Sequence, residues 1–359
     1  MRGTRLRALA PMAGLYFIIS LAAVSISANL AICPGVAVVA AGADEIPFNF
    51  IAYGDTLSVT MPSGVSPLLE DIIDLYLTHD PELIIQLGDL AFLGGTWDQL
   101  MEFNATMTAV WDSGVPFYSA PGNHESAIGD WRQDYSFTNY TQYVHYEDVA
   151  AACGGTELYY SFDYGDVHFI ILNTEDSWVD DVFQCSTEQM TWLQGDIANV
   201  EDDTFLVVAF HRPLYSVREA RPDRWAQAET IRDEFHGLFL QHDVDLVLNG
   251  HDHHYYRSLR DGIYYVVSGG GGAPPAGVDK DAPAWQDGDI GFTEFHFCDV
   301  QVNSSHVTLD VHLLNGTTAD SFTIPRPDTA TGIPMELLVL GIGGAAVVVI
   351  VAVVILRRR

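Results

Sequence analysis

The sequence predicts a layered α/β domain in the middle of a 359-residue chain. Apolar runs of strand length alternate with stretches of helical periodicity from Phe48 onward, which is the pattern of helices packed beside a sheet. Polar motifs that begin with glycine follow four of the strand-like runs, as expected where a strand ends in a turn. A final group of strand-like runs between Gly291 and Ile324 completes the domain.

Three strands and two helices are expected in the first half of the domain. Ser66 is a suitable N-cap, Pro67 suits the first helical position, and apolar residues then recur at helical spacing up to Tyr76. The expected strands are residues 48–53, 83–87 and 115–120, and the expected helices are residues 66–76 and 97–111.

The second half is predicted to alternate strands and helices after an irregular segment. Residues 126–157 show no clear period and are rich in Tyr, Asp and Thr, so we expect a loop across the face that carries the polar motifs. Residues 159–166 are typical of a hairpin leading into the next strand. The remaining expected strands are residues 167–172, 205–210, 244–248, 263–268, 291–300, 305–314 and 321–324, and the remaining helices are residues 187–200 and 226–240.

Long apolar segments lie near both ends of the chain. Residues 1–43 begin with arginines, become apolar and end in small residues, which indicates a secretory signal, with an uncleaved anchor as the alternative. Residues 333–356 are almost wholly apolar and precede three arginines at 357–359, which predicts a transmembrane helix with a cytoplasmic basic tail. The domain at 44–325, joined by a linker at 326–332, is then expected outside the cell, anchored in the cell membrane.

The negative charge belongs to the segment between these ends. Residues 44–332 carry 47 acidic and 10 basic residues, within a chain whose net charge is −32. Such a surface repels the phosphate backbone of nucleic acids, so no nucleic-acid partner is expected. An acidic surface around a cleft also favours cations in that cleft.

Three cysteines follow the expected signal segment, at positions 153, 185 and 298. Their spacing contains no Cys-x-x-Cys pair, which argues against a structural zinc cluster built on thiolates. Export permits disulfides, and we expect Cys153 to pair with Cys185, leaving Cys298 over.

Five strand ends carry residues that suit metal binding. Ligands gather at the carboxyl ends of strands in α/β sheets, and carboxylate, amide oxygen and imidazole together suit Mn, Fe or Zn. Each residue alone is explained as well by a cap or a loop contact, but the set together predicts a metal centre. The residues are Asp55, Asp89, Asn123 with His124, His211, and the pair His251 and His253, which Gly250 precedes and where it permits a turn.

The order of these motifs resembles the calcineurin-like metallophosphoesterases. They run Gly-Asp, Gly-Asp, Gly-Asn-His-Glu, a single His, then Gly-His-x-His. The sequence His211-x-Pro213-x-Tyr215, the run at 251–258 and the glycine run ending in Ala273-Pro274 resemble the purple acid phosphatase branch. The resemblance covers about residues 48–324 and implies a four-layer α/β/β/α sandwich.

The resemblance also implies a role for each matching residue. Two ions, of Fe, Mn or Zn, would share Asp89 as a bridging ligand. The first ion would be bound by Asp55 and His253, and the second by Asn123, His211 and His251. His124, next to Asn123, would lie outside the metal shell as an acid that contacts phosphate.

Two positions depart from the family pattern. The family supplies a further ligand to the first ion, either a His two residues after the first Asp or a Tyr three residues after the second; Leu57 and Phe92 stand there. Without a tyrosinate ligand, no purple iron(III) colour is expected. Thr56, Asp176 or His254 are the candidates to complete the first ion's shell.

The resemblance implies hydrolysis of small phosphorylated substrates. A hydroxide that bridges the two ions would attack phosphorus, with Asp89 at the centre of the site. His124 is the expected proton donor to the leaving oxygen, with His254 as a possible second group. Arg212 and Arg257 are candidates to contact phosphate. The expected function is an extracellular, membrane-tethered phosphatase that acts on monoesters.

Two alternatives remain open at this point. One is a hydrolase for phosphodiesters, nucleotides or an envelope polymer. The other is an ectodomain that binds one metal ion and a ligand without catalysis, for which Leu57 and Phe92 are the argument. The sequence gives no indication of the oligomeric state.

Overall fold

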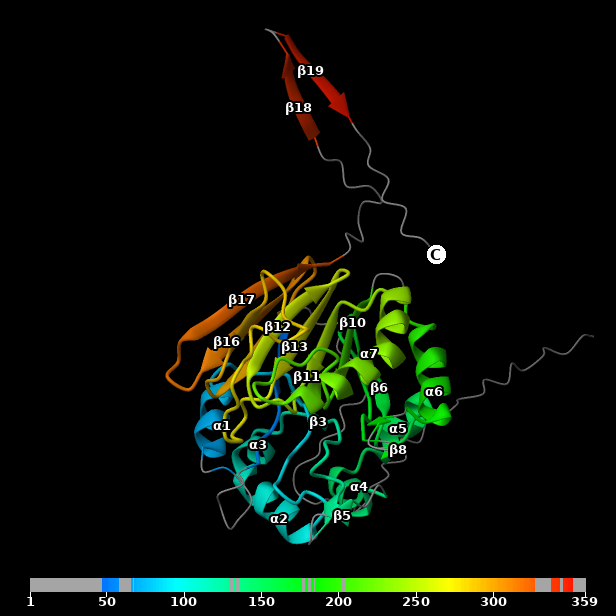
Figure 1. Cartoon of the computed structure of the whole chain (residues 1–359), viewed down its shortest axis with the longest axis vertical. Helices are drawn as coiled ribbons and strands as arrows, with labels where there is room; N and C mark the ends of the chain where they lie inside the picture. The colour runs from blue at the N-terminus through cyan, green and yellow to red at the C-terminus, as the bar shows by residue number, and fades with distance from the viewer. Residues whose placement is uncertain are drawn as a thin grey trace, which may run out of the picture. The chain divides into compact units, whose positions relative to one another are not determined.

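The computed structural model describes most of the chain between Pro47 and Arg326 and two short strands beyond it (Figure 1). The described residues are 47–57, 66, 68–128, 132–133, 136–175, 178–179, 182–183, 185–201, 204–326, 337–342 and 345–350. The expected signal segment at residues 1–43 and all but Arg326 of the expected linker lie outside this set.

The first large sheet has six strands in the order β17-β16-β15-β1-β2-β3. β1, β2 and β3 are parallel. In their register, Tyr53 pairs with Gln86, and Gln86 pairs with Ser119. On the other side of β1 the sheet continues with antiparallel strands. The bounds are β1 Phe48–Tyr53, β2 Leu83–Gln86, β3 Phe117–Ser119, β15 His296–Val302, β16 His306–Leu313 and β17 Thr318–Pro325.

The second large sheet has seven strands in the order β14-β12-β13-β11-β10-β7-β6. Its central strands β7, β10, β11 and β13 are parallel, so their carboxyl ends lie along one edge. The bounds are β6 Tyr160–Tyr164, β7 Val167–Ile171, β10 Phe205–Phe210, β11 Leu246–Asn249, β12 Tyr255–Arg260, β13 Ile263–Ser268 and β14 Ile290–Phe292.

The two large sheets pack face to face, and helices cover their outer faces. Between the sheets, the ring centroids of Phe50 and Phe169 lie 5.1 Å apart. On the outer face of the first sheet, α1 places Tyr76 5.3 Å from Tyr53, and α7 packs phenylalanine rings on Phe210 of the second sheet. This confirms the expected α/β fold. The helices are α1 Leu69–Leu77, α2 Trp97–Thr106, α3 Thr108–Ser113, α6 Thr187–Ile197 and α7 Pro222–Gln241.

The segment at residues 126–157, expected to be a loop, contains two helices. Tyr140 anchors the first by donating a hydrogen bond to the Ser119 carbonyl at 2.9 Å. Tyr146, at the start of the second, donates to the Phe117 carbonyl at 3.1 Å. Tertiary contacts thus stabilise helices too short to show a period in the sequence. They are α4 Thr138–Val144 and α5 Glu147–Cys153, and two short hairpins pair β4 Ala127–Ile128 with β5 Arg132–Gln133 and β8 Trp178–Val179 with β9 Val182–Phe183.

The structure describes only part of residues 333–356, where a transmembrane helix was expected. The described part of this segment is an antiparallel hairpin of β18, Leu337–Ile342, and β19, Ala345–Ile350. Valine and isoleucine dominate β19, and β-branched residues favour strands over helices. Among the described residues, no helix has the length and apolar character needed to cross a membrane.

The expected disulfide between Cys153 and Cys185 is also absent. The Cys153 sulfur accepts a hydrogen bond from the backbone nitrogen of Ser161 at 3.4 Å. The Cys185 sulfur accepts one from Gln189 Nε2 at 3.4 Å. The two sulfurs are therefore engaged with different neighbours.

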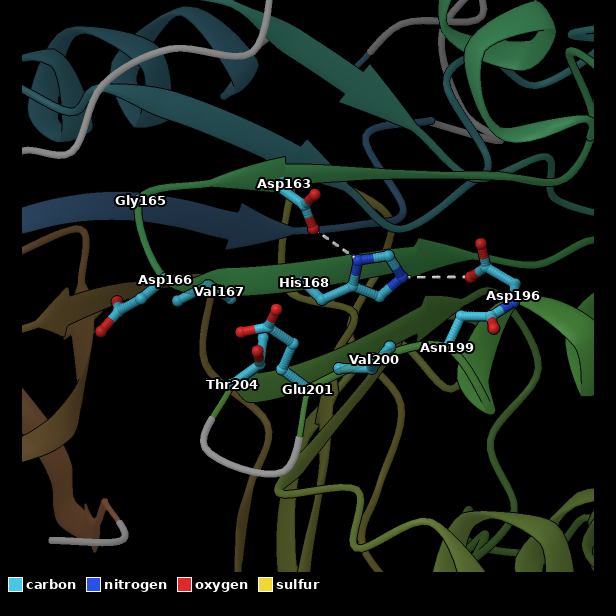
Figure 2. A pocket seen from close by; sticks show the side chains of 10 residues that line it. All are labelled: Asp163, Gly165, Asp166, Val167, His168, Asp196, Asn199, Val200, Glu201 and Thr204. Carbon is cyan, nitrogen blue, oxygen red and sulfur yellow. Dashed lines mark hydrogen bonds and ion pairs between the residues drawn. The ribbon is translucent and has the colours of Figure 1, made fainter. Parts of the chain in front are cut away.

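An ion-paired histidine joins the edge of the second sheet to α6. His168 lines a cavity of about 540 Å³. Figure 2 shows Asp163 on one side of the His168 ring and Asp196 on the other. The distances are 2.6 Å from Nδ1 to Asp163 and 3.0 Å from Nε2 to Asp196. Burial alone would lower the pKa of His168, but the two carboxylates raise it to about 9 from an ordinary 6.5.

Replacing His168 by asparagine is expected to flatten the pH dependence of stability. Because the pKa is raised by folding, its contribution is complete below pH 6.5 and is lost as the pH rises through about 9. The contribution is on the order of 2–3 kcal/mol. Urea unfolding of both proteins at pH 6 and pH 9.5 measures it, and an equal pH dependence in the two proteins would contradict it.

Candidate metal centre

The candidate metal ligands come from loops that follow strands of both large sheets. β1, β2 and β3 end beside one another, and so do β10 and β11. Backbone hydrogen bonds join the two sets of loops across the sheets. Gly54 N donates to Ser268 O at 2.8 Å, and Gly54 O accepts from Gly271 N at 2.9 Å. The strand ends of both sheets therefore meet in one region.

Two of the motif glycines are required by close approach at this region. Gly88 has a φ of +88°, and a Cβ added there would lie 2.5 Å from Nδ1 of His211. A Cβ added at Gly122 would lie 2.3 Å from Oδ1 of Asp89. A larger residue at either position would displace a candidate ligand, which explains why the motifs begin with glycine.

Four of the candidate ligands have backbones in the left-handed region. Residues other than glycine rarely adopt it, and each instance costs on the order of 1–3 kcal/mol. Such strain persists where the surrounding structure enforces it, and it concentrates at functional sites. The residues are Asp55 and Asp89, both with φ 60°, His251 with φ 73° and His253 with φ 48°.

The first group of ligand atoms comes from Asp55, Asp89 and His253, within 4.8 Å of one another. His253 Nδ1 donates to the Pro274 carbonyl at 3.1 Å, which leaves Nε2 facing Asp55 Oδ1 at 3.5 Å. That Oδ1 is buried and has no hydrogen-bond partner among the described residues, and burial raises the pKa of Asp55. A cation at this position would satisfy the buried oxygen.

The second group comes from Asp89, His211 and His251, also within 4.8 Å. His211 Nδ1 donates to the Leu87 carbonyl at 2.7 Å, so Nε2 faces the group. This Nε2 lies 3.2 Å from Asp89 Oδ2 and 3.1 Å from His251 Nδ1. Asn123 Oδ1 lies 3.3 Å from the same nitrogen. The structure therefore brings together all six residues expected to bind metal.

Asp89 belongs to both groups, as a bridging ligand must. Burial favours its neutral form, but the charges of His124 and His211 lower the pKa of Asp89. Burial alone would lower the pKa of His211, and the Asp89 carboxylate raises it to about 9. The carboxylate is thus ionised at neutral pH, and the donor set of carboxylates, amide and imidazoles suits two Fe, Mn or Zn ions.

His124 lies beside the groups without joining them. Its backbone nitrogen donates to Asp89 Oδ1 at 2.9 Å, and its Nδ1 donates to the Phe92 carbonyl at 2.6 Å. Its Nε2 then lies 3.7 Å from Asp89 Oδ2. Phe92 cannot bind metal through its ring, but its carbonyl orients the His124 imidazole.

Among the described residues, neither Thr56 nor His254 belongs to the two ligand groups that contain Asp89. Leu57 is fully buried, and the Thr56 hydroxyl donates to the Leu90 carbonyl at 2.6 Å. Asp176 lies outside the described residues. His254 is fully buried, and burial lowers its pKa to about 4.

The two arginines expected to contact phosphate lie in different surroundings. Arg212 is beside the second group: its Nη1 lies 2.9 Å from His251 Nε2, and its Nη2 donates to Glu175 at 3.0 Å. Arg257 instead pairs with Asp320 of β17 at 2.6 Å and lies over the Phe322 ring. Arg212 therefore lies at the candidate site, whereas Arg257 is engaged with β17.

Glu125 has a role that sequence reasoning missed. Its buried carboxylate accepts three backbone hydrogen bonds of 2.8 Å, from Asp89, Leu90 and Gly122. These bonds tie the loop of Asp89 to the loop of Asn123. Burial, followed by the Asp89 charge, raises the pKa of Glu125 to about 7. The sequence signal that could have identified Glu125 is its position at the end of the Gly-Asn-His-Glu motif.

Replacing Glu125 by glutamine is expected to weaken metal binding by about 10–100-fold, the range for groups that orient metal ligands. The new amide nitrogen would face backbone N–H groups, so at least one donor would lose its acceptor. Metal competition with a chromogenic chelator measures the affinity. Glu188→Gln, at an exposed position of α6, is the control. An unchanged affinity in Glu125→Gln would contradict this role.

Several known proteins with similar sequences are phosphatases by name. The calcineurin-like phosphoesterase family profile matches residues 48–255. The chain is 27% identical over 257 residues to purple acid phosphatase 15 of Arabidopsis thaliana, covering 62% of this chain and 46% of that protein. It is 29% identical over 225 residues to phosphoenolpyruvate phosphatase of Allium cepa, covering 59% and 44%. The chain thus matches less than half the length of these relatives.

A solved structure shares the fold. Purple acid phosphatase PPD1 from yellow lupin (Lupinus luteus) seeds superposes with a TM-score of 0.62 at 23% identity, covering 78% of this chain and 54% of that one. The match to the family covers more than half of the present chain, and the matched residues contain the Gly-Asp, Gly-Asp, Gly-Asn-His-Glu and Gly-His-x-His motifs. This chain therefore belongs to the calcineurin-like phosphoesterase family, in the branch that contains the purple acid phosphatases.

Proposed function

We propose that this protein hydrolyses phosphate esters at a centre of two metal ions. The observation that carries the proposal is the convergence of six side chains from both sheets into two ligand groups that share Asp89. Two buried carboxylates so close together are costly unless positive charge offsets them, and bound cations would supply that charge.

Each residue has a task in the proposed reaction. Two bound ions would lower the pKa of a water molecule and neutralise charge on the phosphoryl oxygens. Asp89 holds the two groups together, and the Leu87 carbonyl fixes the His211 ring with Nε2 toward them. His124 stands where its Nε2 can give a proton to the leaving oxygen. Arg212 contacts Nε2 of His251, the ring nitrogen that does not face His211.

We propose a small phosphate monoester as the substrate class. The names of the relatives, purple acid phosphatase and phosphoenolpyruvate phosphatase, support a monoester. The net charge of −32 disfavours long polyanions such as nucleic acids. One arginine, Arg218, lies near the centre and donates to the His251 carbonyl at 3.0 Å. This charge favours a compact anionic substrate.

A single-metal binding protein without catalysis is the second candidate. Leu57 and Phe92 favour it, because the first group then has only two carboxylates and one imidazole. His124 favours catalysis, since a binding site has no need of a proton donor directed at the shared carboxylate.

Comparing a monoester with a diester tests both candidates. The full-length protein, supplied with Mn, Zn or Fe, is expected to hydrolyse an aryl phosphate monoester faster than its bis-aryl diester. Asn123→Ala, which removes a ligand of the second ion, should abolish turnover, and Asn199→Ala, at an exposed position after α6, should not. A faster diester reaction would change the substrate class, and no turnover of either ester would favour the binding protein.

We also propose that the catalytic domain lies outside the cell, held at the membrane by apolar terminal segments. The support is the sequence alone: residues 1–43 are typical of an export signal, and residues 333–356 precede three arginines. Protease added to intact cells should digest the domain, and the uncut protein should sediment with membranes. A protease-protected, soluble protein would contradict this location.

A further inference from the structure

A third group of potential metal ligands lies apart from the Asp89 groups and shares no residue with them. It consists of His79, Asp299 and His312, each offering one ligand atom within 4.8 Å of the others. The phosphoesterase reaction proposed above uses none of these residues.

Three elements of the first sheet and its covering helix bring the group together. His79 lies two residues beyond the end of α1. Asp299 is on β15 and His312 is on the neighbouring strand β16, where Phe297 pairs with His312. Because Asp299 follows Phe297 by two residues, its side chain points to the same face of the sheet. This is the face that α1 covers through Tyr76, whose ring lies 5.9 Å from Phe297.

The carboxylate of Asp299 is held in place by a neighbouring amide. Asn49 Nδ2 donates to Asp299 Oδ1 at 3.0 Å and to the His79 carbonyl at 3.1 Å. Oδ2 is then directed to His79, whose Nδ1 lies 2.9 Å away. A ligating carboxylate oriented by a hydrogen bond to its other oxygen is a common feature of metal sites.

The two imidazoles lie close together, and both contact the Phe297 ring. The ring centroids of His79 and His312 lie 4.5 Å apart, and each lies 5.4 Å from Phe297. His312 Nε2 is buried and has no hydrogen-bond partner among the described residues. A hydrogen bond between His79 and Asp299 explains why those two side chains lie together without a metal ion. It leaves the buried nitrogen of His312 without a hydrogen bond, which is costly.

We propose that His79, Asp299 and His312 bind a zinc-class divalent cation. Two imidazoles and one carboxylate are a common donor set for Zn²⁺ in tetrahedral geometry, with water in the fourth position. The His79 side chain is 23% exposed, so the site is open to solvent on one side. The cation would fasten the end of α1 to β15 and β16, which gives it a structural task separate from hydrolysis.

Zinc content per chain tests the proposal on the full-length protein. The metal-stripped protein is equilibrated with Zn²⁺ in a weak competing chelator, desalted and analysed by mass spectrometry of metals. His312→Asn should hold about one zinc ion fewer than the wild type. His306→Asn, on the same strand but outside the group, should hold as many as the wild type. Equal zinc content in His312→Asn and the wild type would overturn the proposal.

Two further variants keep the result interpretable. If His312→Asn fails to fold, His79→Gln removes a partly exposed ligand beyond α1, and its zinc content decides in the same way. Asp89→Asn should lose metal at the proposed catalytic centre and still show the loss of one zinc ion when His312→Asn is added. Failure of the catalytic proposal therefore does not mask the outcome here.

Discussion

Replacing Asp89 by asparagine is expected to lower turnover of an aryl phosphate at least about a thousandfold. Asp89 is the residue common to both ligand groups, and a neutral amide cannot bridge two cations as a carboxylate does. Loss of one ion removes several kcal/mol of transition-state stabilisation, and each 1.36 kcal/mol is a factor of about ten in rate. Steady-state kinetics and metal content, measured on the same preparation, check this.

The asparagine variant is chosen because it preserves most local contacts. Its Oδ1 can still accept the backbone hydrogen bond from His124, so the loop should keep its shape. Asp74→Asn, at an exposed position of α1, makes the same chemical change elsewhere and should leave turnover unaltered. If Asp89→Asn kept more than a tenth of the wild-type turnover, Asp89 would not bridge two essential ions.

Replacing His124 by alanine is expected to lower kcat by about 100- to 10,000-fold, which is the contribution of a positioned proton donor. The loss should be larger for an alkyl phosphate than for a p-nitrophenyl phosphate, since the poorer leaving group needs the proton more. Metal content should be unchanged, because the His124 ring lies outside both ligand groups. Parallel kinetics on the two esters measure the difference.

This leaving-group dependence separates a proton donor from a structural residue. A residue that only stabilised the loop would slow both esters by the same factor and would also weaken metal binding. His145→Ala is a suitable control, since His145 is an exposed histidine at the C-terminal end of α4. Equal losses on both esters in His124→Ala would contradict the proposed role.

The strands and the convergence of the candidate ligands could be predicted from the sequence because both depend on local signals. A buried strand such as β10 is a continuous apolar run, and a ligand loop such as Gly88-Asp89 begins where that run stops. The parallel strands then place their carboxyl ends at one edge, so residues spaced far apart along the chain come together.

Elements stabilised by distant contacts were missed. α4 and α5 are seven residues each, and buried tyrosine hydroxyls that reach β3 help hold them. β12 was missed for a different reason. Its hairpin with β13 turns at Asp261-Gly262, both with positive φ, and this Asp-Gly pair is a hairpin signal present in the sequence.

Outside the ligands, site residues could be predicted less well because their roles depend on which partner each side chain reaches. Glu125 contacts three backbone nitrogens on two loops, and Arg212 reaches Glu175 from 37 positions away. Arg257 lies shortly after the histidine run in the sequence, yet its side chain pairs with Asp320 on another strand. Position in a motif does not specify such partners.

Restoring activity to metal-stripped protein tests the central claim most directly. The full-length chain is titrated with Mn²⁺ while hydrolysis of p-nitrophenyl phosphate is followed, with Asn123→Ala titrated in parallel. The account predicts turnover that rises as two ions per chain are bound, with none in the variant. Turnover that is complete with one ion, or that the variant shares, would contradict a two-metal centre at Asp55, Asp89, Asn123, His211, His251 and His253.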